Sequence, residues 1–142
     1  MILNRHQLDE KGIELAEMIE FFFIKEKIGE IDAYVNFSKF PKVEFKNELV
    51  RIEYWIKPEE QECEEQLQIP TIFFEESIRR TGLFIRLMKE LISFCKRYND
   101  MPIIFLGVVS EYFSDLLMRH GGQILSEEFD GKYFAVLPEN WK

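Results

Sequence analysis

Apolar residues with helical spacing predict a long N-terminal helix over residues 6–28, ended by Gly29. Its apolar face consists of Leu8, Leu15, Met18, Ile19, Phe22 and Phe23. Residues 1–3 are compatible with a very short first strand. Residues 31–37 alternate between apolar and polar side chains, which predicts an extended strand after the helix.

Two further runs, 43–45 and 49–56, read as a hairpin turning at residues 46–48. In the second run the apolar side chains alternate with Arg51 and Glu53, so one face is buried and the other polar. The segment 58–66 that follows is rich in Glu and has the composition of a solvated connecting loop.

The second half of the chain alternates between strands and helices. We expect them in the order 69–74 (strand), 83–98 (helix), 102–109 (strand), 112–120 (helix), and 124–129 with 133–137 (hairpin around Asp130-Gly131). The proline near the start of the first strand indicates a sheet edge or a bulge. This order predicts a single α/β domain over residues 1–142 with a crossover between parallel strands.

Charge and composition exclude some functions. The formal net charge is −8, from 26 acidic and 18 basic residues, which argues against a nucleic-acid partner. The apolar run 21–24 is too short to cross a membrane, and no secretory signal is recognisable, so we expect a cytoplasmic protein. The 14 Phe residues suit a well-filled core, although part of the N-terminal helix is also available for a homodimer contact.

The cysteines and histidines offer little chemistry. Cys63 and Cys95 lack zinc-site spacing, and we read both as reduced thiols, with Cys95 an inert core residue. His120 precedes Gly121-Gly122 and is best read as a cation at a helix C-terminus. We therefore expect no metal site.

The segment Arg79-Arg80-Thr81-Gly82 lies between a predicted strand and a predicted helix. Backbone N–H groups and the helix dipole make such a turn a natural anion site. Arg79, Arg80 and Arg86 also form a local basic cluster in an otherwise acidic chain.

This segment resembles the acyl-CoA signature of the GCN5-related N-acetyltransferase (GNAT) superfamily. That signature is Arg or Gln, two residues, Gly, one residue, then Gly or Ala; here Arg79, Gly82 and Phe84 stand at its positions, and Phe74 matches the apolar end of the preceding strand. The resemblance extends over about residues 43–137 and implies a central mixed, mostly antiparallel sheet flanked by helices.

The resemblance also implies acetyl-CoA as cofactor. It assigns the cofactor-binding positions to Phe74, Arg79, Arg80, Thr81, Gly82, Leu83, Phe84 and Ser110. The acyl carbonyl would then meet unpaired backbone N–H groups near residues 73–75, and Glu53, Glu75 or Glu76 would deprotonate the amine.

Two departures bear on the chemistry. Phe84 replaces a small residue: its side chain either blocks the loop or turns into the core, and helical phase does not decide between these. Leu117 stands where the family's proton-donating Tyr is expected, which leaves Tyr112, on another helix face, as a poor substitute.

Two functions follow. The first is acetyl transfer from acetyl-CoA to an amine carried by a small molecule or a protein. The alternative is a catalytically inactive GNAT-like protein that acts through a protein partner, similar to phage-encoded acetyltransferase-like proteins. An open splay between the two central strands and free amides after Arg79 would favour the first. Filling of that space by Phe84, Phe73 and Phe105, with an exposed apolar patch elsewhere, would favour the second.

Overall fold

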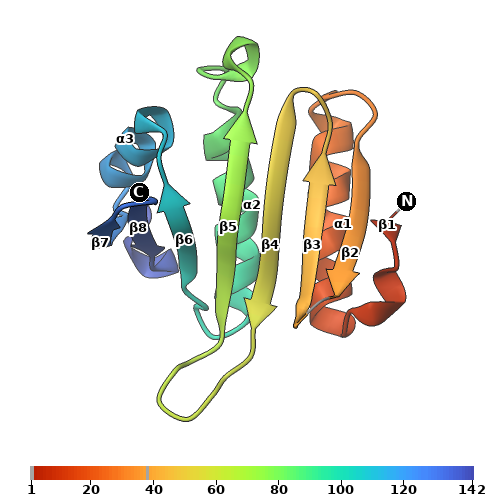
Figure 1. The fold of residues 1–142 in the computed structure, drawn as a ribbon, viewed down its shortest axis with the longest axis horizontal. Coiled ribbons are helices and arrows are strands. Elements are labelled where there is room, and N and C mark those ends of the chain that lie inside the picture. The colour runs from red at the N-terminus through yellow and green to blue at the C-terminus, as the bar shows by residue number, and fades with distance from the viewer. Residues whose placement is uncertain (1, 38) are drawn as a thin grey trace. The chain divides into compact units, whose positions relative to one another are not determined.

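The computed structural model describes residues 2–37 and 39–142. The chain divides into two compact units: unit 1 comprises residues 1–55 and 72–91, and unit 2 comprises residues 56–71 and 92–142. Within the described residues the strands pair in the order β1-β2-β3-β4-β5-β6-β8-β7, so an eight-stranded mixed sheet and three α-helices confirm the predicted α/β class (Figure 1).

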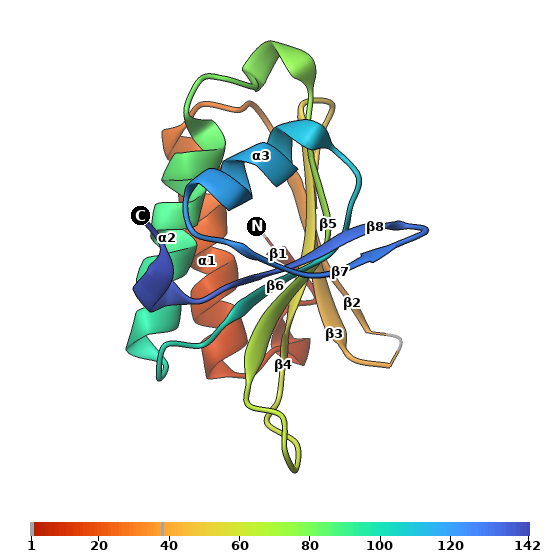
Figure 2. The ribbon, with the colours of Figure 1, turned by 90° about the vertical axis from the view of Figure 1, so that its left-hand side faces the viewer.

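Unit 1 contains a helix packed on strands. Its elements are β1 (Ile2–Leu3), α1 (Glu10–Lys25), β2 (Asp32–Phe37), β3 (Pro41–Lys46) and most of β4 (Val50–Lys57). β1 is parallel to β2, whereas β2, β3 and β4 are antiparallel. α1 lies along one face of these strands (Figure 2), and Phe23 meets Phe45 there with ring centroids 5.9 Å apart.

The helix expected over residues 6–28 is shorter at both ends. Asp9 adopts extended dihedrals and its carboxylate accepts a hydrogen bond from Gly12 N at 2.8 Å, so α1 begins at Glu10. Residues 5–7 form a separate 3-10 turn. At the other end Lys27 has φ 57° and Gly29 has φ 99°, dihedrals that no α-helix contains. Of the short strand expected at residues 1–3, Ile2–Leu3 is present and Met1 lies outside the described residues.

The β3–β4 hairpin turns one residue later than expected, at Asn47–Leu49. The Asn47 side chain sets this turn, because its oxygen accepts from Leu49 N and Val50 N at 2.8 and 2.9 Å. Its amide group donates to Ile28 O and Glu30 O at 3.3 and 3.1 Å, which ties the hairpin to the α1–β2 loop.

Unit 2 contains parallel and antiparallel pairings. β5 (Gln66–Phe74) enters it and runs parallel to β6 (Ile103–Val108), which is antiparallel to β8 (Gly131–Val136); β8 pairs with β7 (Gln123–Glu128). α3 spans Glu111–Arg119. The hairpin turn is Phe129-Asp130, with Gly131 already paired to Glu128, instead of the expected Asp130-Gly131.

β5 begins at Gln66, three residues before the expected start, so Pro70 lies inside the strand. The register of β5 with β6 runs from Leu67 to Ile69 and ends just before this proline. Because proline has no N–H to donate, it suits the point at which a ladder stops.

The helix expected over residues 83–98 is confirmed as α2 (Leu83–Arg97). All six residues of its expected apolar stripe are buried: Leu83, Leu87, Met88, Leu91, Ile92 and Cys95.

Candidate functional site

The connection between β5 and α2 is a tight turn held by its own side chains. A 3-10 turn over Glu76–Ile78 is followed by Arg79, whose Nε donates to Phe74 O at 2.8 Å. The Thr81 hydroxyl donates to Ile78 O at 2.8 Å. The Arg79 side chain is therefore engaged with the end of β5, while Arg80 is exposed and has φ 66°.

The first turn of α2 presents backbone donors. Arg86 N donates to Gly82 O at 3.0 Å, the first hydrogen bond of helical spacing. The backbone N–H groups of this first turn point toward the N-terminal end of α2. Together with the positive end of the helix dipole they favour an anion at this position.

Phe84 turns into the core. Its side chain is fully buried and meets the buried Phe74 ring edge-on, with ring centroids 6.2 Å apart and planes at 78°. Leu83 is buried as well. These three residues therefore offer backbone rather than side chains to a ligand at the loop, and the bulky side chain at position 84 does not fill it.

Arg86 is part of the loop's structure. Its Nε and Nη2 donate to the two carboxylate oxygens of Glu26 at 2.9 and 2.8 Å, and its Nη1 donates to Thr81 O at 2.9 Å. A Cβ built on Gly82, which has φ 82°, would lie 2.8 Å from this Nη1. An alanine here would strain the backbone, and its methyl group would have to displace the guanidinium.

The ion pair keeps both partners charged. The hydrogen bond from Arg86 holds the pKa of Glu26 below its ordinary value, and the same bond raises the pKa of Arg86. Arg86 appeared in the sequence only as one of a basic cluster. Its position four residues after Gly82, one helical turn on, was the signal for its place beside the loop.

Glu75 lies at the start of this connection. Its Oε2 accepts hydrogen bonds from Ser77 N at 2.7 Å and from the Ser77 hydroxyl. These bonds hold the pKa of Glu75 below its ordinary value, which weakens it as a base. The Glu75 N–H donates to Leu49 O at 2.8 Å, so the expectation of an unpaired donor is wrong at this residue.

Glu53 belongs to a polar cluster on β3 and β4. Its oxygens lie 3.2 Å from Arg51 Nη2 and 3.6 Å from Lys42 Nζ. The same Arg51 donates through Nε to the buried Glu44 at 2.7 Å, and Glu44 also accepts from the Tyr34 hydroxyl. Burial raises the pKa of Glu44, but the bonds from Tyr34 and Arg51 outweigh it and hold that pKa below its ordinary value.

The remaining predicted site residues lie in unit 2. Ser110 is the N-cap of α3 without a side-chain capping bond, and Tyr112 is half-buried with its ring 5.0 Å from that of Phe113. Leu117 is fully buried and offers no proton. These residues form a local group of their own around α3.

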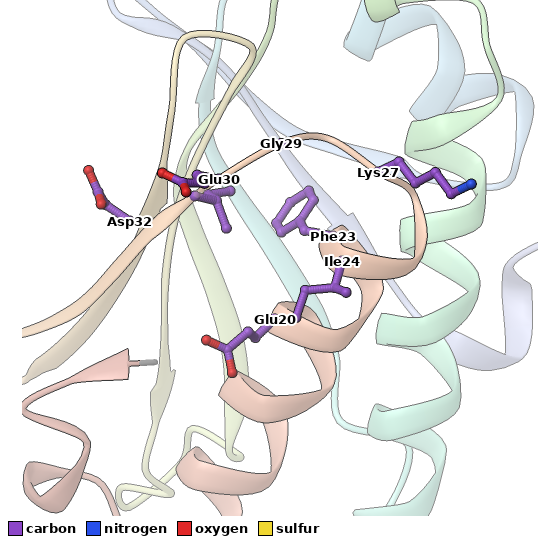
Figure 3. A pocket seen from close by; sticks show the side chains of 8 residues that line it. Glu20, Phe23, Ile24, Lys27, Gly29, Glu30 and Asp32 are labelled. Carbon is purple, nitrogen blue, oxygen red and sulfur yellow. The ribbon is translucent and has the colours of Figure 1, made fainter.

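A concavity lies in unit 1, at the end of α1. It has a volume of about 650 Å³ and is lined in part by Phe23, Ile24, Glu30 and Asp32. Figure 3 shows that the Lys27 ammonium points away from the carboxylates of Glu30 and Asp32. None of the residues expected from the sequence to be functional lines it.

No group of three or more His, Cys, Asp or Glu side chains within 2–37 and 39–142 is arranged to hold a metal ion. No helix among the same residues combines the length and apolar character needed to span a bilayer.

Comparison with known proteins is informative at the level of structure. No family model matches the chain, and no curated protein matches it in sequence. An acetyltransferase of the GNAT family from Staphylococcus aureus Mu50 superposes with TM-score 0.50 at 14% identity, covering 97% of each chain.

Two other solved structures are similar at a lower score. The KacTA–DNA complex gives TM-score 0.47 at 13% identity, covering 87% of this chain and 80% of that one. An acyl-CoA N-acyltransferase from Pseudomonas aeruginosa gives 0.43 at 17% identity, covering 90% of each. From the strand order and the match over nearly the whole chain, this protein has the fold of the GCN5-related N-acetyltransferases.

Proposed function

We propose that this protein is an N-acyltransferase that takes an acyl group from acetyl-CoA and transfers it to an amine. The observation that carries the proposal is the β5–α2 loop, where Phe84 is buried and Gly82 lies beside the Arg86 guanidinium. The loop thus keeps a backbone that a ligand can approach, although its signature lacks the final small residue.

The residues at this loop fit a diphosphate-bearing cofactor. The amides at the start of α2 are hydrogen-bond donors for phosphate oxygens, and Arg80 and Arg86 supply positive charge. Bound acetyl-CoA supplies an acyl group already activated as a thioester. Arg79, tied to Phe74 O, holds the loop against the end of β5.

Glu75 is our first choice for the residue that accepts the amine proton. Both hydrogen bonds from Ser77 reach its Oε2. Glu53 is the second choice, because Arg51 and Lys42 already neutralise its charge. Leu117 carries no proton, so we assign protonation of the leaving thiolate to water.

The amine belongs to a small molecule or to a protein, and the acidic chain suits a cationic acceptor. We place the protein in the cytoplasm. A catalytically inactive relative that acts by contact stays the alternative prediction.

Calorimetric titration of acetyl-CoA tests the proposal. We expect micromolar affinity in the wild type and a loss of at least about tenfold in Gly82→Ala, because a methyl group there displaces Arg86 and strains the backbone. The matched control is Gly29→Ala, another positive-φ glycine with no heavy atom within 4 Å of its added methyl.

Turnover is then measured as thiol release with a panel of amines. Glu75→Gln is expected to lower kcat by about 100-fold while leaving acetyl-CoA affinity unchanged, as expected for a general base. If millimolar acetyl-CoA gives no binding heat with the wild type, the enzyme hypothesis is wrong.

A further inference from the structure

The Arg86 guanidinium is fixed from two sides. Glu26, the C-cap residue of α1, holds Nε and Nη2, and the Thr81 carbonyl holds Nη1. An arginine has five N–H donors. Three make these bonds, so one on Nη1 and one on Nη2 are left for another acceptor.

These two donors are accessible beside the loop backbone. The Arg86 side chain is 45% exposed, and its Nη1 lies 2.8 Å from the position that a Gly82 Cβ would take. The donors therefore lie next to the amides that begin α2. An anion with two oxygens on adjacent centres can accept from both sets, and its charge makes these hydrogen bonds stronger than those to an uncharged ligand.

Glu26 determines how the guanidinium is presented. Its two oxygens bind one edge of the guanidinium plane, which fixes the plane's orientation. The glutamate side chain is only 16% exposed, so it is itself well positioned. Removing Glu26 would free Arg86 to rotate into solvent.

We propose that Arg86 is the specificity-determining residue by which this loop selects a diphosphate-bearing ligand, and that Glu26 is its positioning residue. The identity of that ligand as acetyl-CoA rests on the proposed function, but the selection of diphosphate does not. The proposal adds α1 to the binding machinery, through a carboxylate far from the signature segment in sequence.

Removal of Glu26 has opposite expected effects on anion affinity under simple electrostatics and under positioning. Simple electrostatics predicts that removing a carboxylate near an anion site tightens anion binding. Positioning predicts the opposite, because the guanidinium is no longer held. We expect Glu26→Ala to weaken binding about threefold and Arg86→Met to weaken it about tenfold or more.

The experiment titrates inorganic pyrophosphate and, separately, acetyl-CoA into the wild type and the variants at constant ionic strength. Arg86→Lys keeps the charge but lacks the planar fork, and we expect it to bind nearly as weakly as Arg86→Met. In the Arg86→Met background, Glu26→Ala should cause no further loss of affinity, because there is no guanidinium left to position. Thermal melts report whether each variant is folded.

Two controls match the variants. Glu90→Ala removes another carboxylate of the α1–α2 contact, paired with Lys25 Nζ at 3.7 Å, and Lys89→Ala removes an exposed cation from the same helix. Neither side chain takes part in the bonds that hold Arg86, and both variants should bind as the wild type does.

The outcomes separate this inference from the proposed function. If pyrophosphate binds in a way that depends on Arg86 and Glu26, and acetyl-CoA does not bind, the inference is supported and acetyl-CoA is ruled out as the cofactor. Acetyl-CoA binding that is unchanged in folded Arg86→Met overturns the inference and leaves the cofactor. Tighter binding by Glu26→Ala overturns the positioning role, and the absence of binding by either ligand overturns both.

Discussion

Phe84 meets Phe74 edge-on in the core of unit 1, with ring centroids 6.2 Å apart. The contact places the largest side chain of the loop signature under the loop, and Phe74 ends the strand that leads into it. Phe84, which departs from the small residue of the signature, therefore packs in the core. The buried pair links the end of β5 to the first turn of α2.

Truncation of Phe84 should lower the stability of the fold and leave the affinity for acetyl-CoA unchanged. We expect Phe84→Ala to lower the free energy of unfolding by about 3–5 kcal/mol, because a fully buried ring is removed and a cavity remains. Urea denaturation measures this loss. Acetyl-CoA affinity in the folded variant should be unchanged, and a large gain in affinity would show that the ring obstructs the loop after all.

Two positive-φ glycines should differ strongly in their tolerance of alanine. A Cβ on Gly121, at φ 104°, would lie 2.2 Å from the Asn140 carbonyl oxygen, whereas a Cβ on Gly29, at φ 99°, meets no heavy atom within 4 Å. We expect Gly29→Ala to cost about 1 kcal/mol for the dihedral alone. Gly121→Ala should cost several-fold more, because backbone must move, and equal melting temperatures would contradict this reasoning.

Acid should weaken unit 1 through Glu44. The folded-state pKa of this buried carboxyl lies below its ordinary value of 4.5, so its contribution is present above that value and is lost as the pH falls through the folded pKa. Glu44→Gln should therefore flatten the dependence of unfolding free energy on pH below about 4.5. The control is Glu48→Gln, an exposed turn residue, which should leave the curve unchanged.

The two thiols should differ in reactivity. Burial raises the pKa of Cys95 to about 12, with a smaller contribution from the Glu65 charge, whereas Cys63 is half-buried in the β4–β5 loop. In the folded protein a chromogenic disulfide reagent should titrate Cys63 and leave Cys95, and denaturant should expose both. Cys63→Ser should abolish the fast phase, and a fast phase that persists would contradict the burial of Cys95.

Element types and the order of elements were predictable because their signals are local. The alternation around Arg51 and Glu53 identified β4, and the buried stripe of α2 followed from helical spacing. Boundaries were less predictable: Asp9 as an N-cap and Asn47 as a turn residue act through hydrogen bonds that a periodicity does not reveal.

The loop that we propose as an anion site was likewise visible as residue types, because its glycine and arginines lie between a predicted strand and a predicted helix. The chemistry expected of Glu53, Glu75 and Tyr112 stays a prediction. What the geometry adds is that Ser77 engages Glu75, and that Arg51 and Lys42 engage Glu53.

The sequence by itself determined the α/β class, the succession of elements and the place of the loop, because these depend on residues close together in the chain. Only the tertiary structure decided that Phe84 is buried and that Glu26, 60 residues before Arg86, holds its guanidinium. Helical phase gives a side chain's direction around its own axis. Which neighbour it meets depends on how distant segments pack, and that is settled only when the chain has folded.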